Sequence, residues 1–95
     1  MNSFIFICSS ETEKECYERQ LFGTSNFNYY DKYFRKIKVG DDLFLYNYDI
    51  GHLQGPFKAI TICEKNIDPE AWRCKKKRGF PYQVNCFYLI DFWNS

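Results

Sequence analysis

The sequence predicts a small α+β domain in which a curved, mostly antiparallel sheet or partial barrel carries two helices after the first strand. Three observations lead to this prediction. A short β-branched and aromatic run opens the chain, two stretches with apolar residues at helical spacing follow it, and the later apolar runs have the length and composition of strands. Ninety-five residues are enough for one compact domain and too few for two, so residues 1–95 are expected to fold as one unit.

The first strand is expected at 3–8, where "SFIFIC" is short, continuous and rich in β-branched and aromatic residues. A helix should follow over about 10–21. Ser10 and Glu13 have the spacing of a capping box, and Gly23 stands just past the expected end. The side chains that we expect to face the core from this helix are Cys16, Tyr17, Gln20 and Leu21.

A second helix is expected over about 28–37, after the polar loop "TSNFN". Four residues there recur at the i, i+3, i+4, i+7 spacing of one helix face, namely Tyr30, Tyr33, Phe34 and Ile37. The turn residues "VGDD" end this pattern.

Three further strands are expected at 43–48, 56–64 and 82–91, with "DIGH" as a hairpin connection between the first two. The strand at 43–48 is apolar on both faces, with Leu43 and Leu45 on one and Phe44, Tyr46 and Tyr48 on the other. A strand of this kind is covered on both sides, as when helices lie outside a curved sheet. "IDPEAW" reads as a short helical turn.

The cysteines bear on the cellular compartment, and so does the start of the sequence, which has no apolar core of a signal peptide. The five cysteines have no CxxC pair and no regular spacing. They are expected to be reduced thiols that pack as small hydrophobes in an intracellular protein, cytoplasmic or nuclear. A zinc site is the alternative, but it lacks paired ligands and His52 is the only histidine. No cofactor, no metal and no membrane span are expected.

The stretch "WRCKKKRGFP" holds a concentrated positive charge. Residues 73–78 include five of the 13 basic residues and no acid, whereas the rest of the chain is net acidic. These five are Arg73, Lys75, Lys76, Lys77 and Arg78. One interpretation is a solvated loop, and the other is a phosphate-binding segment. Trp72 either caps the core or offers a stacking platform for a base.

Four segments resemble the signatures of the DCD (development and cell death) domain, which are FGLP, LFL, PAQV and PLxE. They are "FGTS" (22–25), "LFL" (43–45), "PYQV" (81–84) and "YLID" (88–91). The resemblance covers nearly the whole chain. It implies a small PUA-like domain, since DCD domains look like members of the PUA-like superfamily, which also holds the YTH and EVE nucleic-acid readers.

A weaker similarity to YTH domains concerns the turn around Ser9 and Ser10 and the segment that begins at Phe22. In YTH domains two tryptophans enclose a methylated adenine. The resemblance implies that Phe22 and Trp72 could form such walls here. Capping of a helix is the alternative role for Ser9 and Ser10, and a place in the core is the alternative for Phe22.

We therefore expect a non-catalytic binding module, because no arrangement of catalytic side chains and no phosphate-binding glycine loop is suggested by the sequence. The first hypothesis is a nucleic-acid-binding domain for RNA or for single-stranded or modified DNA. Its expected site comprises Ser9, Ser10, Phe22, Trp72, Arg73, Lys75, Lys76, Lys77 and Arg78. The alternatives are a protein–protein interaction module in stress or cell-death signalling and a small-molecule sensor.

Overall fold

The structure is a computed structural model that describes residues 2–73 and 79–88. Its elements are β1 (Ser3–Cys8), α1 (Ser10–Arg19), β2 (Leu21–Thr24), α2 (Phe27–Lys32), the 3-10 helix η1 (Phe34–Lys36), β3 (Asp42–Asn47), β4 (His52–Ala59), β5 (Glu64–Lys65) and β6 (Tyr82–Tyr88). The predicted α+β class is confirmed. The expected strand at 82–91 is observed as far as residue 88, and its last three residues lie outside the described part of the chain.

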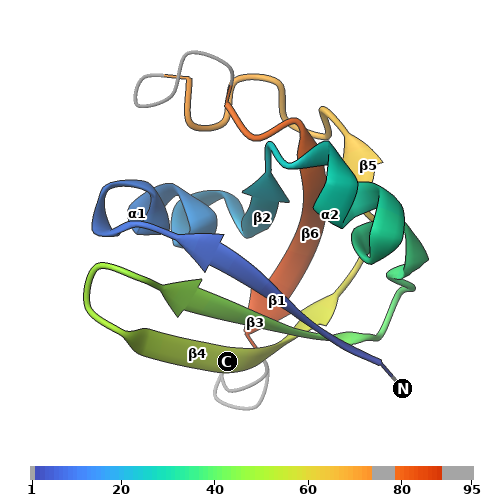
Figure 1. Ribbon diagram of the computed structural model, residues 1–95, viewed down its shortest axis with the longest axis horizontal. Helices are drawn as coiled ribbons and strands as arrows, with labels where there is room; N and C mark the ends of the chain where they lie inside the picture. Colours follow the sequence, from blue (N-terminus) through green and yellow to red (C-terminus); the bar gives the residue numbers. More distant parts are fainter. Residues whose placement is uncertain (1, 74–78, 89–95) are drawn as a thin grey trace.

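The strands form a strongly curved sheet in the order β1-β3-β4-β6-β2, and the short β5 pairs with β6 (Figure 1). The β1–β3 pair is parallel and the other pairs are antiparallel. The sheet bends so far that its two ends approach each other, and the rings of Phe6 on β1 and Phe22 on β2 have centroids 5.8 Å apart. The fold is therefore nearly a barrel with a seam between β1 and β2, which fits a PUA-like domain.

The first helix is confirmed, but its cap lies one residue earlier than predicted. Ser9 is the N-cap, its hydroxyl accepts from the Thr12 amide at 3.2 Å, and the Thr12 hydroxyl accepts from the Ser9 amide at 3.0 Å. Thr12 therefore takes the capping-box role expected for Glu13. Gln20 ends the helix in the left-handed conformation at φ 51°, so Gly23 is not needed as the stop.

The strand β2 was not predicted, because Leu21–Thr24 was interpreted as a helix end and a loop. Leu21, Phe22 and Gly23 are buried, and β2 pairs with β6. Gly23 lies here because a Cβ at this position would come within 2.9 Å of both the Phe80 Cβ and the Trp72 ring. The glycine thus allows the indole to pack directly on the strand backbone.

The second helical stretch breaks into two short pieces, α2 and η1, where one helix over 28–37 was expected. Phe34 and Ile37 are buried as predicted, whereas Tyr33 is exposed. Phe34 stacks on Phe6 with ring centroids 4.1 Å apart, so this segment closes one end of the curved sheet. In Figure 1 α1 and α2 lie at opposite ends of the sheet.

The prediction that the outer face of β3 is covered by helices is wrong for the part of the chain that the structure describes. Leu43 and Leu45 are buried as expected, but Phe44 and Tyr46 are only half-buried. Both helices lie at the ends of the sheet, and its convex face carries neither of them.

Candidate functional site

Trp72 lies in the core, with an exposed fraction of 0%. Its indole packs edge-on against Phe80, with ring centroids 4.9 Å apart, and its Nε1 donates to the Thr12 carbonyl at 3.2 Å. A ring that is enclosed on all sides offers no free π-face to a base. The interpretation of Trp72 as a stacking platform is therefore wrong, and the alternative of a core role holds.

Phe22 is also buried, with an exposed fraction of 1%, and its ring contacts Phe6 and Phe57. A base cage needs both Phe22 and Trp72 to line one open pocket. The two rings line no common pocket, because strand β2 turns Phe22 inward and the indole of Trp72 is fully buried against α1. They therefore do not form a methyl-base cage.

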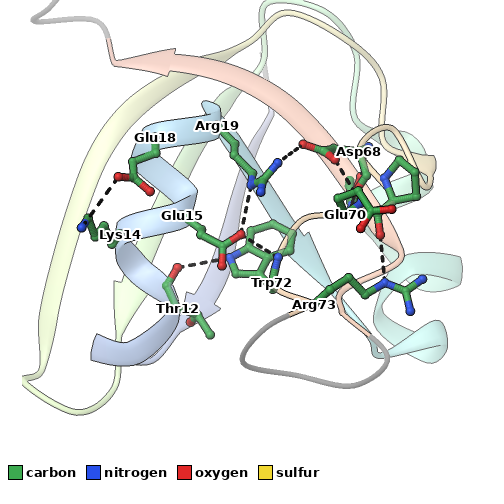
Figure 2. A network of polar contacts seen from close by, with 11 residues as sticks. Thr12, Lys14, Glu15, Glu18, Arg19, Asp68, Glu70, Trp72 and Arg73 are labelled. Atoms are coloured by element: carbon green, nitrogen blue, oxygen red, sulfur yellow. Dashed lines mark hydrogen bonds and ion pairs between the residues drawn. The ribbon is translucent and has the colours of Figure 1, made fainter.

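A polar network on α1 holds Trp72 in place (Figure 2). The Glu15 carboxylate accepts from the Trp72 amide at 2.7 Å and from Arg19 Nε at 3.0 Å, and Arg19 also donates to Asp68 at 2.6 Å. Trp72 itself has a left-handed backbone at φ 60°, which a non-glycine residue adopts only when its surroundings impose it. The network fixes the position of Trp72, the residue that precedes the basic segment in the sequence.

Most of the predicted basic site lies outside the described residues, namely Lys75, Lys76, Lys77 and Arg78. Arg73 is described and exposed, and its Nε donates to the Pro69 carbonyl at 2.8 Å. The structure therefore supports an exposed cation directly after the buried tryptophan. Phosphate binding by this segment stays a prediction.

Ser9 is the N-cap of α1, and Ser10 is the first residue of the helix. The Ser10 amide donates to Asp49 Oδ2 at 2.8 Å, and the Ser9 amide is bound by the Thr12 hydroxyl. Asp49 thus supplies the anion that a helix N-terminus favours. Residues of the domain therefore occupy the backbone amides of Ser9 and Ser10, which agrees with the capping alternative and leaves neither amide for a phosphate or a base edge.

A groove that sequence reasoning missed runs along β1, on the side away from β3. Its larger cavity has a volume of about 400 Å³, within the range of ligand pockets. The residues that line it come from β1, β2, α2 and η1, and they are Ser3, Phe4, Ile5, Ile7, Thr24, Tyr29, Tyr33 and Phe34. A second cavity of about 230 Å³ continues it past Ile7 and Thr24 toward Ser9, Tyr48 and Phe80. Together they follow the seam of the incomplete barrel.

The sequence indicated an apolar strand here but not which of its faces would be exposed. Ile5 and Ile7 alternate with Phe4 and Phe6, and a run that is apolar on both faces is typical of a strand covered on both sides. Ile5 and Ile7 are 53% and 56% exposed. The sequence did not show that β1 would be an edge strand, because its parallel pairing with β3 depends on a chain segment about forty residues away.

The four described cysteines, Cys8, Cys16, Cys63 and Cys86, are free and buried, which agrees with their expected role as small hydrophobes. Burial raises the pKa of the Cys63 and Cys86 thiols to about 12 in each case. Within residues 2–73 and 79–88 no cluster of ligands that could hold a metal occurs. Among the same residues, no helix has the length and hydrophobicity to cross a membrane.

Comparison with known proteins gives a family match over almost the whole chain, because the model of the Development and cell death domain matches residues 2–92. The B2 protein of Daucus carota is 44% identical over 87 residues, which cover 88% of this chain and 41% of the relative. DCD domain-containing protein NRP-B of Glycine max is also 44% identical, over 88% of this chain and 26% of the relative. DCD domain-containing protein NRP of Arabidopsis thaliana is 39% identical, with 88% and 24% covered. The chain thus spans less than half of the length of each of these relatives.

Proposed function

The chain belongs to the development and cell death domain family, and from this premise we propose that it is a non-catalytic module that binds a protein partner. The single observation that carries the proposal is the apolar groove along β1. Half-exposed aromatic and aliphatic side chains around a cavity are typical of protein interaction sites, in which a few buried anchors contribute most of the binding energy. The names of the relatives describe them as domain-containing proteins, which is consistent with a binding module.

Site-directed photo-crosslinking tests this proposal. A benzophenone amino acid at Tyr33 places the reactive group in the groove, and the same amino acid at Ile62, which is 49% exposed, is the control. Irradiation in an extract of the native cells should give a protein adduct from position 33 and not from position 62. The partner is then identified by mass spectrometry and purified. Equal adducts from both positions, or no protein adduct at position 33, would contradict the proposal.

Nucleic-acid binding is a second candidate function, and the basic segment 73–78 favours it. Since the stacking rings are buried, this function would rest on phosphate contacts alone and would show little sequence preference. Binding of a uridine decamer should then weaken steeply as the salt concentration rises. It should be lost when Lys75, Lys76 and Lys77 are changed together to Glu, and binding that ignores this triple change refutes the candidate.

A further inference from the structure

The strand β1 presents an unpaired backbone edge to the groove. Among the described residues β1 is the last strand of the sheet and pairs only with β3. The Asn2 carbonyl accepts from the amide of Asp42, the first residue of β3, and the Cys8 carbonyl accepts from the amide of Tyr48, which directly follows β3. The even-numbered residues of β1 therefore direct their backbone groups toward β3. The alternation of a strand then directs the amides and carbonyls of its odd-numbered residues to the free edge. Such an edge is a template for another extended chain.

The groove has apolar residues on both sides of this edge. Ile5 and Ile7 lie on the outer face of β1, whereas Phe4 lies on the inner face and packs edge-on against Phe34 at 6.4 Å between ring centroids. Tyr29 stacks on Phe34 at 5.9 Å and forms the opposite wall. An added strand would therefore find apolar contacts for side chains that point to either face of the sheet.

The rim of the groove beside α2 is basic. The Lys32 ammonium lies 5.4 Å from the centre of the Tyr33 ring, which lines the groove. Residues 31–38 contain four basic residues and one acid, Asp31, which is ion-paired with Arg35 at 3.7 Å. The acid on β3, Asp42, is paired with Lys58. Lys32 is thus a cation next to a ring that lines the groove, and it favours an acidic ligand.

We propose that the partner inserts an extended, acidic segment with alternating apolar side chains, which pairs with β1 and fills the seam between β1 and β2. This inference rests on the proposed protein-binding function. A peptide fits better than a nucleic acid, because the edge offers alternating donors and acceptors whereas phosphates only accept. The added strand would extend the sheet beyond β1, at the place where the barrel is open.

The test uses fluorescence anisotropy with a panel of seven-residue peptides in which Glu or Asp alternates with Val, Ile or Phe. Scrambled peptides of the same composition are the controls. At least one alternating sequence should bind. N-methylation of the peptide amides that face β1 should abolish its binding, whereas N-methylation of the other amides should leave the affinity unchanged. In amide exchange, Ile5 and Ile7 should gain protection, and Phe4 and Phe6, which already face β3, should change little.

Two pairs of variants locate the site on the domain. Ile7→Lys should weaken binding about tenfold or more, since it removes an apolar contact at the edge. Leu53→Lys, on the same face of the sheet but on β4 and with a similar exposure of 52%, should leave the affinity within about twofold. Lys32→Glu should weaken the binding of the acidic peptides and reduce the salt dependence of their affinity. Lys14→Glu on α1 should change neither.

The outcomes separate this inference from the proposed function. A purified partner that crosslinks at Tyr33 but leaves the Ile5 and Ile7 amides unprotected would overturn strand addition and leave protein binding intact. Failure of every alternating peptide to bind at about 1 mM, or equal binding of the scrambled set, would also overturn it. Protection of the same two amides by the uridine decamer and not by peptides would assign the groove to nucleic acid and refute both proposals.

Discussion

Replacement of Trp72 by alanine tests directly whether this ring belongs to the core or to a binding surface. The side chain is fully buried, packs on Phe80, and donates to the Thr12 carbonyl. Truncation of a buried tryptophan costs about 3–5 kcal/mol, which includes the lost apolar contacts and the cavity that remains. A 95-residue domain has a free energy of unfolding of about 5–14 kcal/mol, so the variant should lose a large part of its stability.

The measurement is equilibrium unfolding in urea followed by far-UV circular dichroism, because the substitution removes a fluorophore. In urea, Trp72→Ala should lower the free energy of unfolding by about 3–5 kcal/mol. A thermal scan followed by the same signal should show a melting temperature lower by about 12 °C or more, at 4–8 °C per kcal/mol for a domain of this size. Trp72→Phe should be intermediate, since it keeps a ring but leaves the Thr12 carbonyl without its donor. Tyr48→Ala, at a ring that is 57% exposed, should change stability by less than about 1 kcal/mol. A loss below about 1 kcal/mol for Trp72→Ala would refute the core assignment.

Three other predictions concern the contacts around Trp72 and the buried cysteines. Glu15→Ala should destabilise the domain by about 1.5–3 kcal/mol in urea unfolding, because the carboxylate accepts from a backbone amide and from a guanidinium. The control Glu18→Ala removes only an exposed ion pair and should cost less than about 0.5 kcal/mol. Gly23→Ala should cost about 1–3 kcal/mol by the same assay, because the added methyl meets two side-chain carbons at 2.9 Å, and a neutral effect would contradict this packing. In a Cys74→Ser variant, whose four remaining thiols are the buried ones, dithionitrobenzoate at pH 8 should react only as the protein unfolds, and fast labelling of the native domain would show that these thiols are accessible.

The sequence was a good guide where local patterns decide the structure. The alternation in 43–45 put Leu43 and Leu45 on one face of a covered strand, and both are buried. The Ser-rich turn before α1 predicted a capped helix within one residue. It failed for β2, because Gly23 next to a helical pattern indicates a helix stop, while its actual role depends on a tryptophan 49 positions later in the chain. Only tertiary packing could show that this glycine makes room for an indole.

The aromatic part of the candidate site, Phe22 and Trp72, was mispredicted for a related reason. A tryptophan beside five cations indicates a nucleic-acid surface by composition, yet composition cannot tell which way a ring points. Glu15, on a helix nearly sixty residues away, binds the Trp72 amide and holds the ring inside. Glu15 on the acidic helix α1 therefore has a structural role, because it holds the buried Trp72 in place.

The burial of Trp72 and Phe22 determines which apolar side chains remain at the surface of the domain. Because Trp72 and Phe22 are used to close the interior, the exposed aromatic and aliphatic side chains around the seam come from other elements, β1 and α2. Leu21–Thr24 pairs with β6, so among the described strands β1 has β3 as its single partner and the barrel is open at one seam. Extended apolar edges promote self-association unless they are covered or charged. Lys32 beside the groove supplies such a charge in the free domain, and an acidic strand is the ligand that would neutralise it while covering the edge.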